Sequence, residues 1–202
     1  MKVVTPMIFS IVSLVLAPVT SATTVVENKT QRAVQVKLFK EHDDILQRHF
    51  EGSALQFSAA IPLEQRAIEF HLSLAEASAQ GQVADLKYDS VEVALRHQFF
   101  SANSMKLLTE SRFNHISYSG STTHSYNQYG AGLVGRDYWG EKLQVEVRLG
   151  YLGASGAAPS AQKGLYTEAR LSYPVTSDLA LYMQWSSLGK RDITAIGAEY
   201  RF

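Results

Sequence analysis

The stretch that decides the fold is Leu143–Tyr151, which reads LQVEVRLGY. Its apolar side chains occupy every second position, and Gln, Glu, Arg and Gly lie between them. Successive side chains of a β-strand point to opposite faces of the sheet, whereas an α-helix repeats about every 3.6 residues. The stretch therefore predicts a strand with one apolar face and one polar face.

The same period of two recurs on both sides of this stretch and is clearest in Ile68–Leu74 and Leu165–Tyr173. The further candidate strands are Ala33–Lys40, Ala54–Ala60, Ile68–Leu74, Val91–Leu95, Met105–Phe113, Tyr126–Arg136, Leu165–Tyr173, Leu179–Trp185 and Ile196–Phe202. Segments of about this length, in an even number, are typical of antiparallel strands that cross a membrane at a tilt. We predict an all-β chain folded as a transmembrane up-and-down β-barrel of ten strands.

The links between the candidate strands alternate in length and polarity. The short, turn-like links are Ile61–Gln65, Ser101–Ser104, Asp137–Lys142 and Pro174–Asp178. The longer or more polar links are Glu41–Ser53, Ser78–Asp89, Ser119–His124, Ala154–Gln162 and Leu188–Asp192. Outer-membrane barrels have tight turns on the periplasmic side and longer loops outside. The order of the links therefore favours this kind of barrel.

Two other architectures fit parts of the pattern. The polar segment Glu41–Gly52 interrupts two weak strands, so Thr23–Pro62 could form an extension and leave eight strands in Gln65–Phe202. A soluble periplasmic barrel or sandwich also alternates, with its apolar side chains inside and its charges outside. The apolar face of Leu143–Tyr151 would then be core rather than lipid-facing.

Aromatic residues are expected to form two girdles at the membrane interfaces. The group near the short turns is Phe99, Phe100, Tyr138, Trp139, Tyr173 and Phe202. The group near the opposite rim is Tyr88, Tyr118, Tyr151 and Trp185.

The final segment, Ala-Ile-Gly-Ala-Glu-Tyr-Arg-Phe, carries apolar or aromatic side chains at every second position and ends at Phe202. It resembles the C-terminal strand by which the outer-membrane assembly machinery recognises bacterial outer-membrane β-barrel proteins. The resemblance makes Tyr200 and Phe202 the assembly signal. It also implies contact with periplasmic chaperones, outer-membrane lipid and lipopolysaccharide.

The N-terminus and the composition indicate export. Met1–Ala22 has a basic start, a short apolar core and small residues near its end, as in a secretory signal peptide cleaved near Ala22. The remainder, 23–202, is expected to be one barrel domain in the outer membrane of a Gram-negative bacterium, as a monomer. The chain has 19 basic and 19 acidic residues and no cysteine, which argues against a nucleic-acid partner and excludes thiolate metal sites.

If the apolar row faces lipid, the polar row faces the lumen. The inward charges are Glu92, Arg96, Glu110, Arg112, Glu146, Arg148, Glu168, Arg170, Glu199 and Arg201. Carboxylates and guanidinium groups on one face of adjacent strands can pair, so these residues predict a filled lumen rather than a conduit. The first functional hypothesis is a non-enzymatic structural or surface-interaction role through the extracellular loops, with an external ligand that the sequence does not identify. A narrow porin-like channel for small solutes is the alternative.

The polar segment after the first candidate strand contains His42, Asp43, Asp44 and His49, which could in principle bind a metal ion. Such residues in a loop are usually solvated, so we expect no metal and no other cofactor.

His115 and Ser117 are two residues apart on a candidate strand and therefore share one face. The pair is similar to the His-x-Ser pair of the outer-membrane lipid A deacylases, small barrels with a Glu as the third member. In that family the Glu follows shortly after the Ser, whereas the next acid here is Asp137. The family's pair also lies near the end of the chain, whereas several candidate strands follow it here. This resemblance makes a lipid A-modifying hydrolase the third hypothesis.

Overall fold

The computed structural model describes residues 30–63, 66–80, 86–120, 123–140, 142–156 and 161–202. The predicted signal peptide lies outside these residues. The elements, in chain order, are β1 (Gln31–Asp43), β2 (Arg48–Leu63), β3 (Arg66–Ala79), β4 (Lys87–Ala102), β5 (Met105–Ser119), β6 (His124–Trp139), β7 (Leu143–Ser155), β8 (Gly164–Pro174), β9 (Leu179–Leu188) and β10 (Arg191–Arg201).

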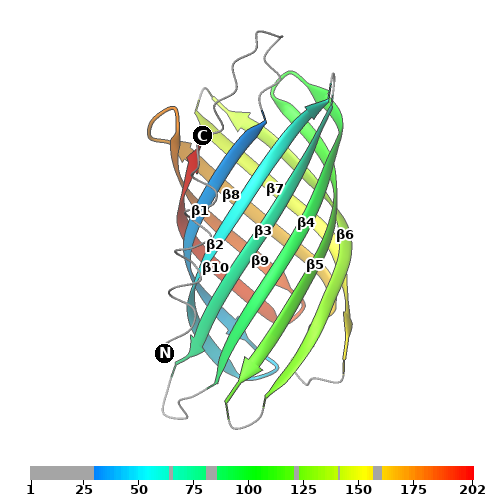
Figure 1. The fold of residues 1–202 in the computed structure, drawn as a ribbon, viewed down its shortest axis with the longest axis vertical. Helices are drawn as coiled ribbons and strands as arrows, with labels where there is room; N and C mark the ends of the chain where they lie inside the picture. The colour runs from blue at the N-terminus through cyan, green and yellow to red at the C-terminus, as the bar shows by residue number, and fades with distance from the viewer. Residues whose placement is uncertain (1–29, 64–65, 81–85, 121–122, 141, 157–160) are drawn as a thin grey trace.

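The ten strands form one closed barrel in which every strand pairs antiparallel with its neighbours in sequence, and β1 closes the ring against β10 (Figure 1). The predicted ten-stranded barrel is confirmed. The eight-stranded alternative is wrong, because β1 and β2 are full members of the wall. The short turns lie at the top of Figure 1 and the other links at the bottom, and we call these the short-turn end and the loop end.

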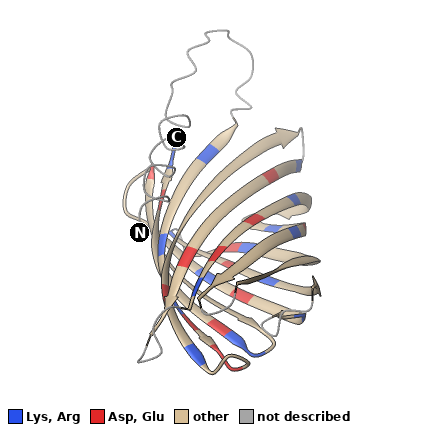
Figure 2. Ribbon diagram, turned by 60° about the horizontal axis from the view of Figure 1, so that its bottom comes forward, with Lys and Arg blue, Asp and Glu red and all other residues tan. Residues whose placement is uncertain are grey.

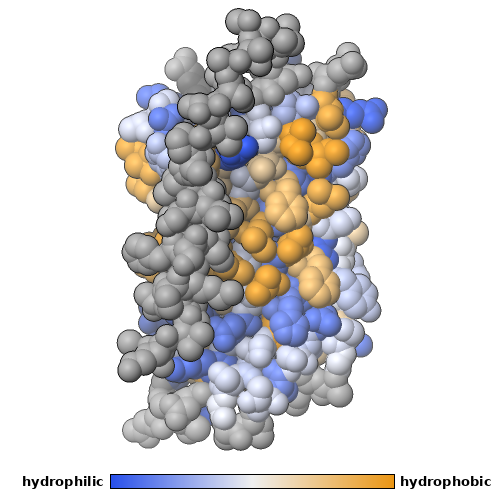
Figure 3. Space-filling view, viewed as in Figure 1, coloured by the Kyte–Doolittle hydropathy of each residue, from blue (hydrophilic) through white to orange (hydrophobic). Residues whose placement is uncertain are grey.

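The wall has the polarity expected of a barrel surrounded by lipid. On β7, Val147 is 51% exposed, whereas its neighbour Arg148 is only 7% exposed. The same contrast recurs around the wall. Apolar side chains gather in a band on the face seen in Figure 3, and charged positions recur on strands around the barrel in Figure 2. The reversed arrangement of a soluble barrel is therefore not observed.

The polarity inverts at the loop end, where the strands continue beyond the apolar band. There Phe39 and Phe50 point inward and are buried, whereas Lys40 and Glu51 lie outside and form an exposed ion pair of 2.9 Å. Because both wall faces lie against water or protein at this level, the apolar side chains gather inside as in a soluble protein. The segment Glu41–Ser53, predicted as a polar link, is mostly strand for this reason, and the link itself is only 44–47.

The same inversion corrects one predicted girdle. Tyr88 and Tyr118 are buried inside the barrel, so they do not belong to the outer girdle, whereas Tyr151 and Trp185 are exposed on the wall. At the short-turn end, Phe99 creates a β-bulge in β4. The bulge allows Phe99 and its neighbour to be exposed together, although adjacent residues of a regular strand point to opposite faces.

Candidate functional sites in the lumen and on the outer wall

Glu110 of β5 lies in the lumen and is almost fully buried. Its carboxylate contacts Arg96 at 2.7 Å, Arg112 at 3.1 Å and Arg148 at 4.0 Å. The hydroxyl of Tyr166 donates a hydrogen bond of 2.8 Å to the same carboxylate. Three cations and one hydroxyl therefore share a single carboxylate, which ties β4, β5, β7 and β8 together.

Two glycines make room for the Tyr166 ring. A Cβ atom at Gly132 would lie 2.6 Å from the Tyr166 hydroxyl oxygen, and one at Gly150 would lie 2.5 Å from a ring carbon. Both positions face the lumen on β6 and β7, opposite each other in the register. The ring can therefore cross these two strands from β8 and reach Glu110 on β5.

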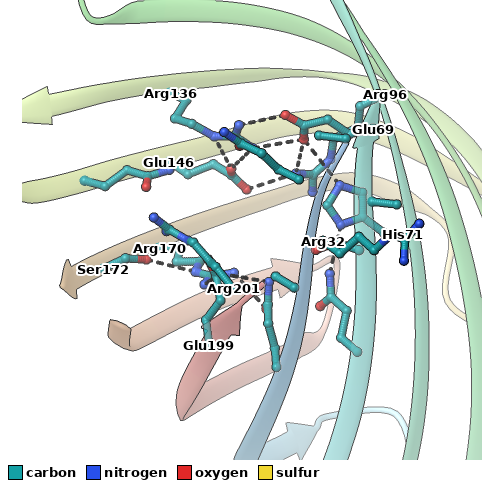
Figure 4. Close-up of a pocket in the computed structure, with 18 of the residues that line it drawn as sticks. Arg32, Glu69, His71, Arg96, Arg136, Glu146, Arg170, Ser172, Glu199 and Arg201 are labelled. Carbon is teal, nitrogen blue, oxygen red and sulfur yellow. Dashed lines mark hydrogen bonds and ion pairs between the residues drawn. The ribbon is translucent and has the colours of Figure 1, made fainter. Parts of the chain in front are cut away.

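Glu146 of β7 is a second carboxylate shared by several cations. It contacts Arg136 and Arg148 at 2.8 Å each, and Arg96 at 3.4 Å. Arg136 also contacts Glu69 at 2.8 Å, which joins β6 to β3 (Figure 4). We call the following set the ion-pair layer: Glu69, Arg96, Glu110, Arg136, Glu146 and Arg148.

Two of the predicted lumen carboxylates pair with an arginine of the adjacent strand. Glu92 of β4 contacts Arg112 of β5 at 3.6 Å. Glu168 of β8 contacts Arg148 of β7 at 3.0 Å, and the two residues are directly opposite in the register. Side chains directly opposite each other on adjacent strands are close enough to pair, so Glu168 joins β8 to β7.

Glu199 contacts Arg201 of the same strand at 2.6 Å, toward the short-turn end. Glu199 also contacts Arg170 at 2.6 Å. Arg170 donates further hydrogen bonds to Gln35 at 2.9 Å and to Ser172 at 3.0 Å, and Figure 4 shows this group beside the ion-pair layer.

A second cluster, which the sequence analysis did not single out, lies nearer the loop end. Arg191 of β10 donates two hydrogen bonds to Glu41 of β1, one of them at 2.8 Å. Its guanidinium lies 5.2 Å from the centre of the Tyr88 ring. We call the buried rings around this pair the aromatic layer: Phe39, Phe50, Tyr88, Tyr118 and Tyr126. Extending the inward parity of β1 by one more position would have predicted Glu41 as a lumen residue.

Two cavities lie in the lumen of the described part of the chain. One, of about 170 Å³, is at the short-turn end, and its lining includes Gln35, His71 and Arg170. The other, of about 130 Å³, includes Lys37 and Arg112 and reaches toward the aromatic layer. The two cavities share no lining residue, because the ion-pair layer lies between them.

His115 and Ser117 lie on the outward face of β5, near the loop end. His115 is directly opposite Asn127 of β6, and its Nδ1 atom lies 2.7 Å from the Asn127 Oδ1 atom. Ser117 has Asp89 of β4 opposite it on one side and Ser125 of β6 on the other. We call these five residues the wall patch. The structure brings Asn127 and Asp89 to the predicted pair, and both were missed in the sequence.

Asp137, the next acid after Ser117 in the sequence, lies away from this pair. It accepts a hydrogen bond from Ser104 at the short-turn end, far along the barrel from Ser117. The signal for Asn127 was present in the sequence, because antiparallel pairing of the two candidate strands on either side of Ser119–His124 brings Asn127 opposite His115. Among the described residues, no hydrogen bond joins His115 to Ser117.

The other predicted residues occupy the outer surface. The rings of Tyr200 and Phe202 are stacked 6.3 Å apart and are exposed at the short-turn end. His42 and His49 stack at 4.4 Å on the outside of the loop end, and His42 contacts Asp44 at 2.7 Å. No group of three or more metal-ligating side chains gathers anywhere in the described ranges.

The chain is similar to known proteins in structure but not in sequence. No protein-family model matches the sequence, and no curated protein does. The chain is similar to the translocator domain of the autotransporter NalP from Neisseria meningitidis, with a TM-score of 0.52 and 13% identity over 98% of this chain and 95% of that one.

Two further likenesses have similar scores. The β domain of the Bordetella autotransporter BrkA gives a TM-score of 0.53 and 10% identity, over 86% of this chain and 99% of that one. An outer-membrane channel from Pseudomonas putida F1 gives 0.53 and 11% identity, over 88% and 97%. Identities this low bear on the fold alone. These likenesses agree with the closed antiparallel barrel described above, and the apolar wall gives that fold the polarity of a membrane-spanning β-barrel.

Proposed function

We propose that the protein is a non-conducting outer-membrane barrel that acts through its outer wall and loops, not through its lumen. The observation that supports this proposal most is the ion-pair layer, in which buried Arg96 and Glu110 fill the centre of the barrel. The aromatic layer fills the lumen again nearer the loop end. A channel needs a continuous aqueous path through the lumen. Side chains that fill the lumen at two successive levels argue against such a path. The primary role is therefore structural or surface-interacting.

Purified protein in planar lipid bilayers is expected to give no steady conductance at either polarity, because the ion-pair layer leaves no continuous path. An outer-membrane porin prepared in the same detergent serves as the positive control. Stable, stepwise currents from the wild-type protein would contradict the sealed lumen and favour the narrow channel.

A second candidate function rests on the wall patch. The oxygen of the Asn127 amide can only accept a hydrogen bond, so it fixes the proton of His115 on Nδ1. The Nε2 atom is then left with a lone pair that can accept the hydroxyl proton of Ser117. A base oriented by a third group and placed beside a hydroxyl is the arrangement used for nucleophilic catalysis.

The position of the patch suggests an acyl ester lipid as the substrate class. Phe113 and Tyr129 are exposed on the same face, one residue pair closer to the short-turn end. Aromatic side chains mark the membrane interface, which is where the ester groups of lipids lie. Ser117 would attack the ester carbonyl carbon, and His115 would take the hydroxyl proton and return it to the departing alcohol. Water would then hydrolyse the acyl-enzyme.

Replacing Ser117 with Ala is expected to lower fatty-acid release from phospholipid in mixed micelles by about 10³-fold or more, because the nucleophile is lost. Asn127→Ala removes only the orienting group and is expected to cost about 10²-fold. Ser125→Ala, in the same patch but away from His115, should retain full activity.

Mass spectra of lipid A from cells with and without the protein extend this test to lipopolysaccharide. If wild-type protein releases no fatty acid from phospholipid and leaves lipid A unchanged, the hydrolase candidate fails. If Ser117→Ala and Ser125→Ala retain equal activity, the assignment of the nucleophile fails.

A further inference from the structure

Some polar atoms in the lumen have no partner within the protein, and several of them gather around one cavity. It is the cavity of about 130 Å³ described above, which we call the middle cavity. The Nε atom of Arg112 and the Oδ1 atom of Asn114 are buried without a hydrogen-bond partner. Both residues line the middle cavity, and they are two apart on β5, so they share the inward face.

Lys37 of β1 lines the same cavity from another part of the wall. Its amine forms no hydrogen bond or ion pair with any described residue. Buried polar groups in proteins are nearly always hydrogen-bonded, either to the protein or to a bound molecule. Three unpartnered polar groups around one space therefore indicate that the space has a polar occupant.

The charges of the lining already have ionic partners. The side chain of Arg112 is only 10% exposed, and its other two nitrogen atoms contact Glu110 at 3.1 Å and Glu92 at 3.6 Å. Glu168, which also lines the cavity, contacts Arg148 at 3.0 Å. The cavity therefore offers unused hydrogen-bonding positions rather than a strong field of one sign.

The unused positions are of opposite kinds. The Nε–H group of Arg112 and the amine of Lys37 donate, whereas Oδ1 of Asn114 only accepts. A simple anion cannot donate to Asn114, and a simple cation cannot accept from Arg112 or Lys37. A hydroxyl group both donates and accepts, so neighbouring hydroxyls can meet all three positions. The rings of Phe39 and Tyr88 also line the cavity and offer apolar surface to a carbon skeleton.

The middle cavity reaches the loop end of the barrel. Its lining includes Leu188 at the end of β9 and Arg191 at the start of β10, on either side of the link 189–190. Toward the other end, the ion-pair layer separates it from the short-turn cavity of about 170 Å³. The longer loops of outer-membrane barrels face the outside of the cell. A ligand would therefore enter from outside and would not pass through.

We propose that the middle cavity is a binding site for a small neutral compound with neighbouring hydroxyl groups, which enters from outside the cell. This site goes beyond the role of the outer wall and loops proposed above. A cavity of about 150 Å³ holds benzene in another protein, so about 130 Å³ suits a molecule of about six non-hydrogen atoms, such as glycerol. The hydroxyl groups belong either to a free polyol or to one end of a sugar that protrudes at the loop end.

The test is isothermal titration calorimetry of the refolded protein in a zwitterionic detergent that has no sugar headgroup. Glycerol is the probe, and 1-propanol, which has the same carbon skeleton but a single hydroxyl, is the matched control. We expect saturable binding of glycerol with a dissociation constant below about 10 mM, and none of 1-propanol. Glucose separates the two sources, since tighter binding of glucose would identify a sugar and tighter binding of glycerol a free polyol.

Variants place the binding in the middle cavity. Lys37→Met with Asn114→Leu removes a donor and the acceptor with little change in volume, so it should weaken binding at least about ten-fold. Asn114→Leu alone keeps every lumen charge and should weaken binding in the same direction. Lys40→Met is the matched control, because Lys40 lies on the same strand but is exposed outside the barrel, and its affinity should equal that of wild type.

Heat-modifiable migration on a gel shows that each variant is folded before it is titrated. If neither glycerol nor glucose binds saturably to the wild-type protein, the cavity holds water only and the proposal is overturned. Equal binding of 1-propanol and glycerol, or equal affinity in Asn114→Leu and Lys40→Met, would overturn it as well.

Discussion

Replacing Glu110 with Ala is expected to lower the free energy of unfolding of the barrel by about 3 to 5 kcal/mol. Glu110 is buried among three arginines and accepts the hydrogen bond of Tyr166. Its removal leaves cations in the lumen without their shared partner, and an uncompensated buried charge costs more than the ion pair itself contributes. Urea titration of protein refolded into lipid vesicles measures the change.

The matched control is Glu51→Ala. Glu51 also forms an ion pair, with Lys40 at 2.9 Å, but both side chains are exposed to solvent. Exposed pairs contribute about 1 kcal/mol or less, so this variant should be close to wild type. Equal, small effects at Glu51 and Glu110 would show that the ion-pair layer is hydrated and does not fill the lumen.

Replacing Val147 with Arg is expected to lower the free energy of unfolding by about 2 to 4 kcal/mol in lipid vesicles. Val147 lies outside the wall near the middle of β7, between Gly135 and Ala169 on the adjacent strands. The new charge would therefore lie in the hydrocarbon of the bilayer. Ser155→Arg, on the same face of β7 but at its loop end, should cost only about 0 to 1 kcal/mol.

The difference between these two variants is what the membrane assignment predicts, and urea titration in the same vesicles measures both. In a water-soluble barrel both arginines would be solvated, and the two variants would unfold alike. If Ser155→Arg lowers the free energy of unfolding as much as Val147→Arg does, the result would also contradict the proposal that the loop end of β7 lies outside the hydrocarbon of the bilayer.

The strands were predictable because their period of two is local. Leu143–Tyr151 alternates over its whole length, and parity along it already assigns Val147 to the wall and Arg148 to the lumen. The prediction was wrong at Glu41–Ser53, where the strands leave the apolar band. Residues that face outward there, such as Glu51, are polar, and so is inward-facing Glu41, so the segment has the composition of a loop although it continues the wall.

The contacts across the lumen could not be predicted in the same way. Arg136 on β6 reaches Glu69 on β3, and Tyr166 on β8 reaches Glu110 on β5. Such contacts depend on the tilt of the strands and on the barrel diameter, which follow from the register of all ten pairings together. Alternation along a strand shows only which face of the wall a residue lies on. The ten lumen charges could therefore be assigned to the lumen from the sequence, but not all of the residues that they contact there.

The membrane-spanning barrel with its charges inside is tested most directly by spin labels on opposite faces of β9. The chain has no cysteine, so Met183→Cys and Ser186→Cys each give a single labelling site. Met183 is exposed on the wall, and Ser186 lines the lumen cavity of about 130 Å³. In lipid vesicles, relaxation by oxygen, which concentrates in the bilayer, should dominate at position 183 and not at position 186. The reverse result, with the label at position 186 in lipid and that at 183 shielded from it, would contradict the account.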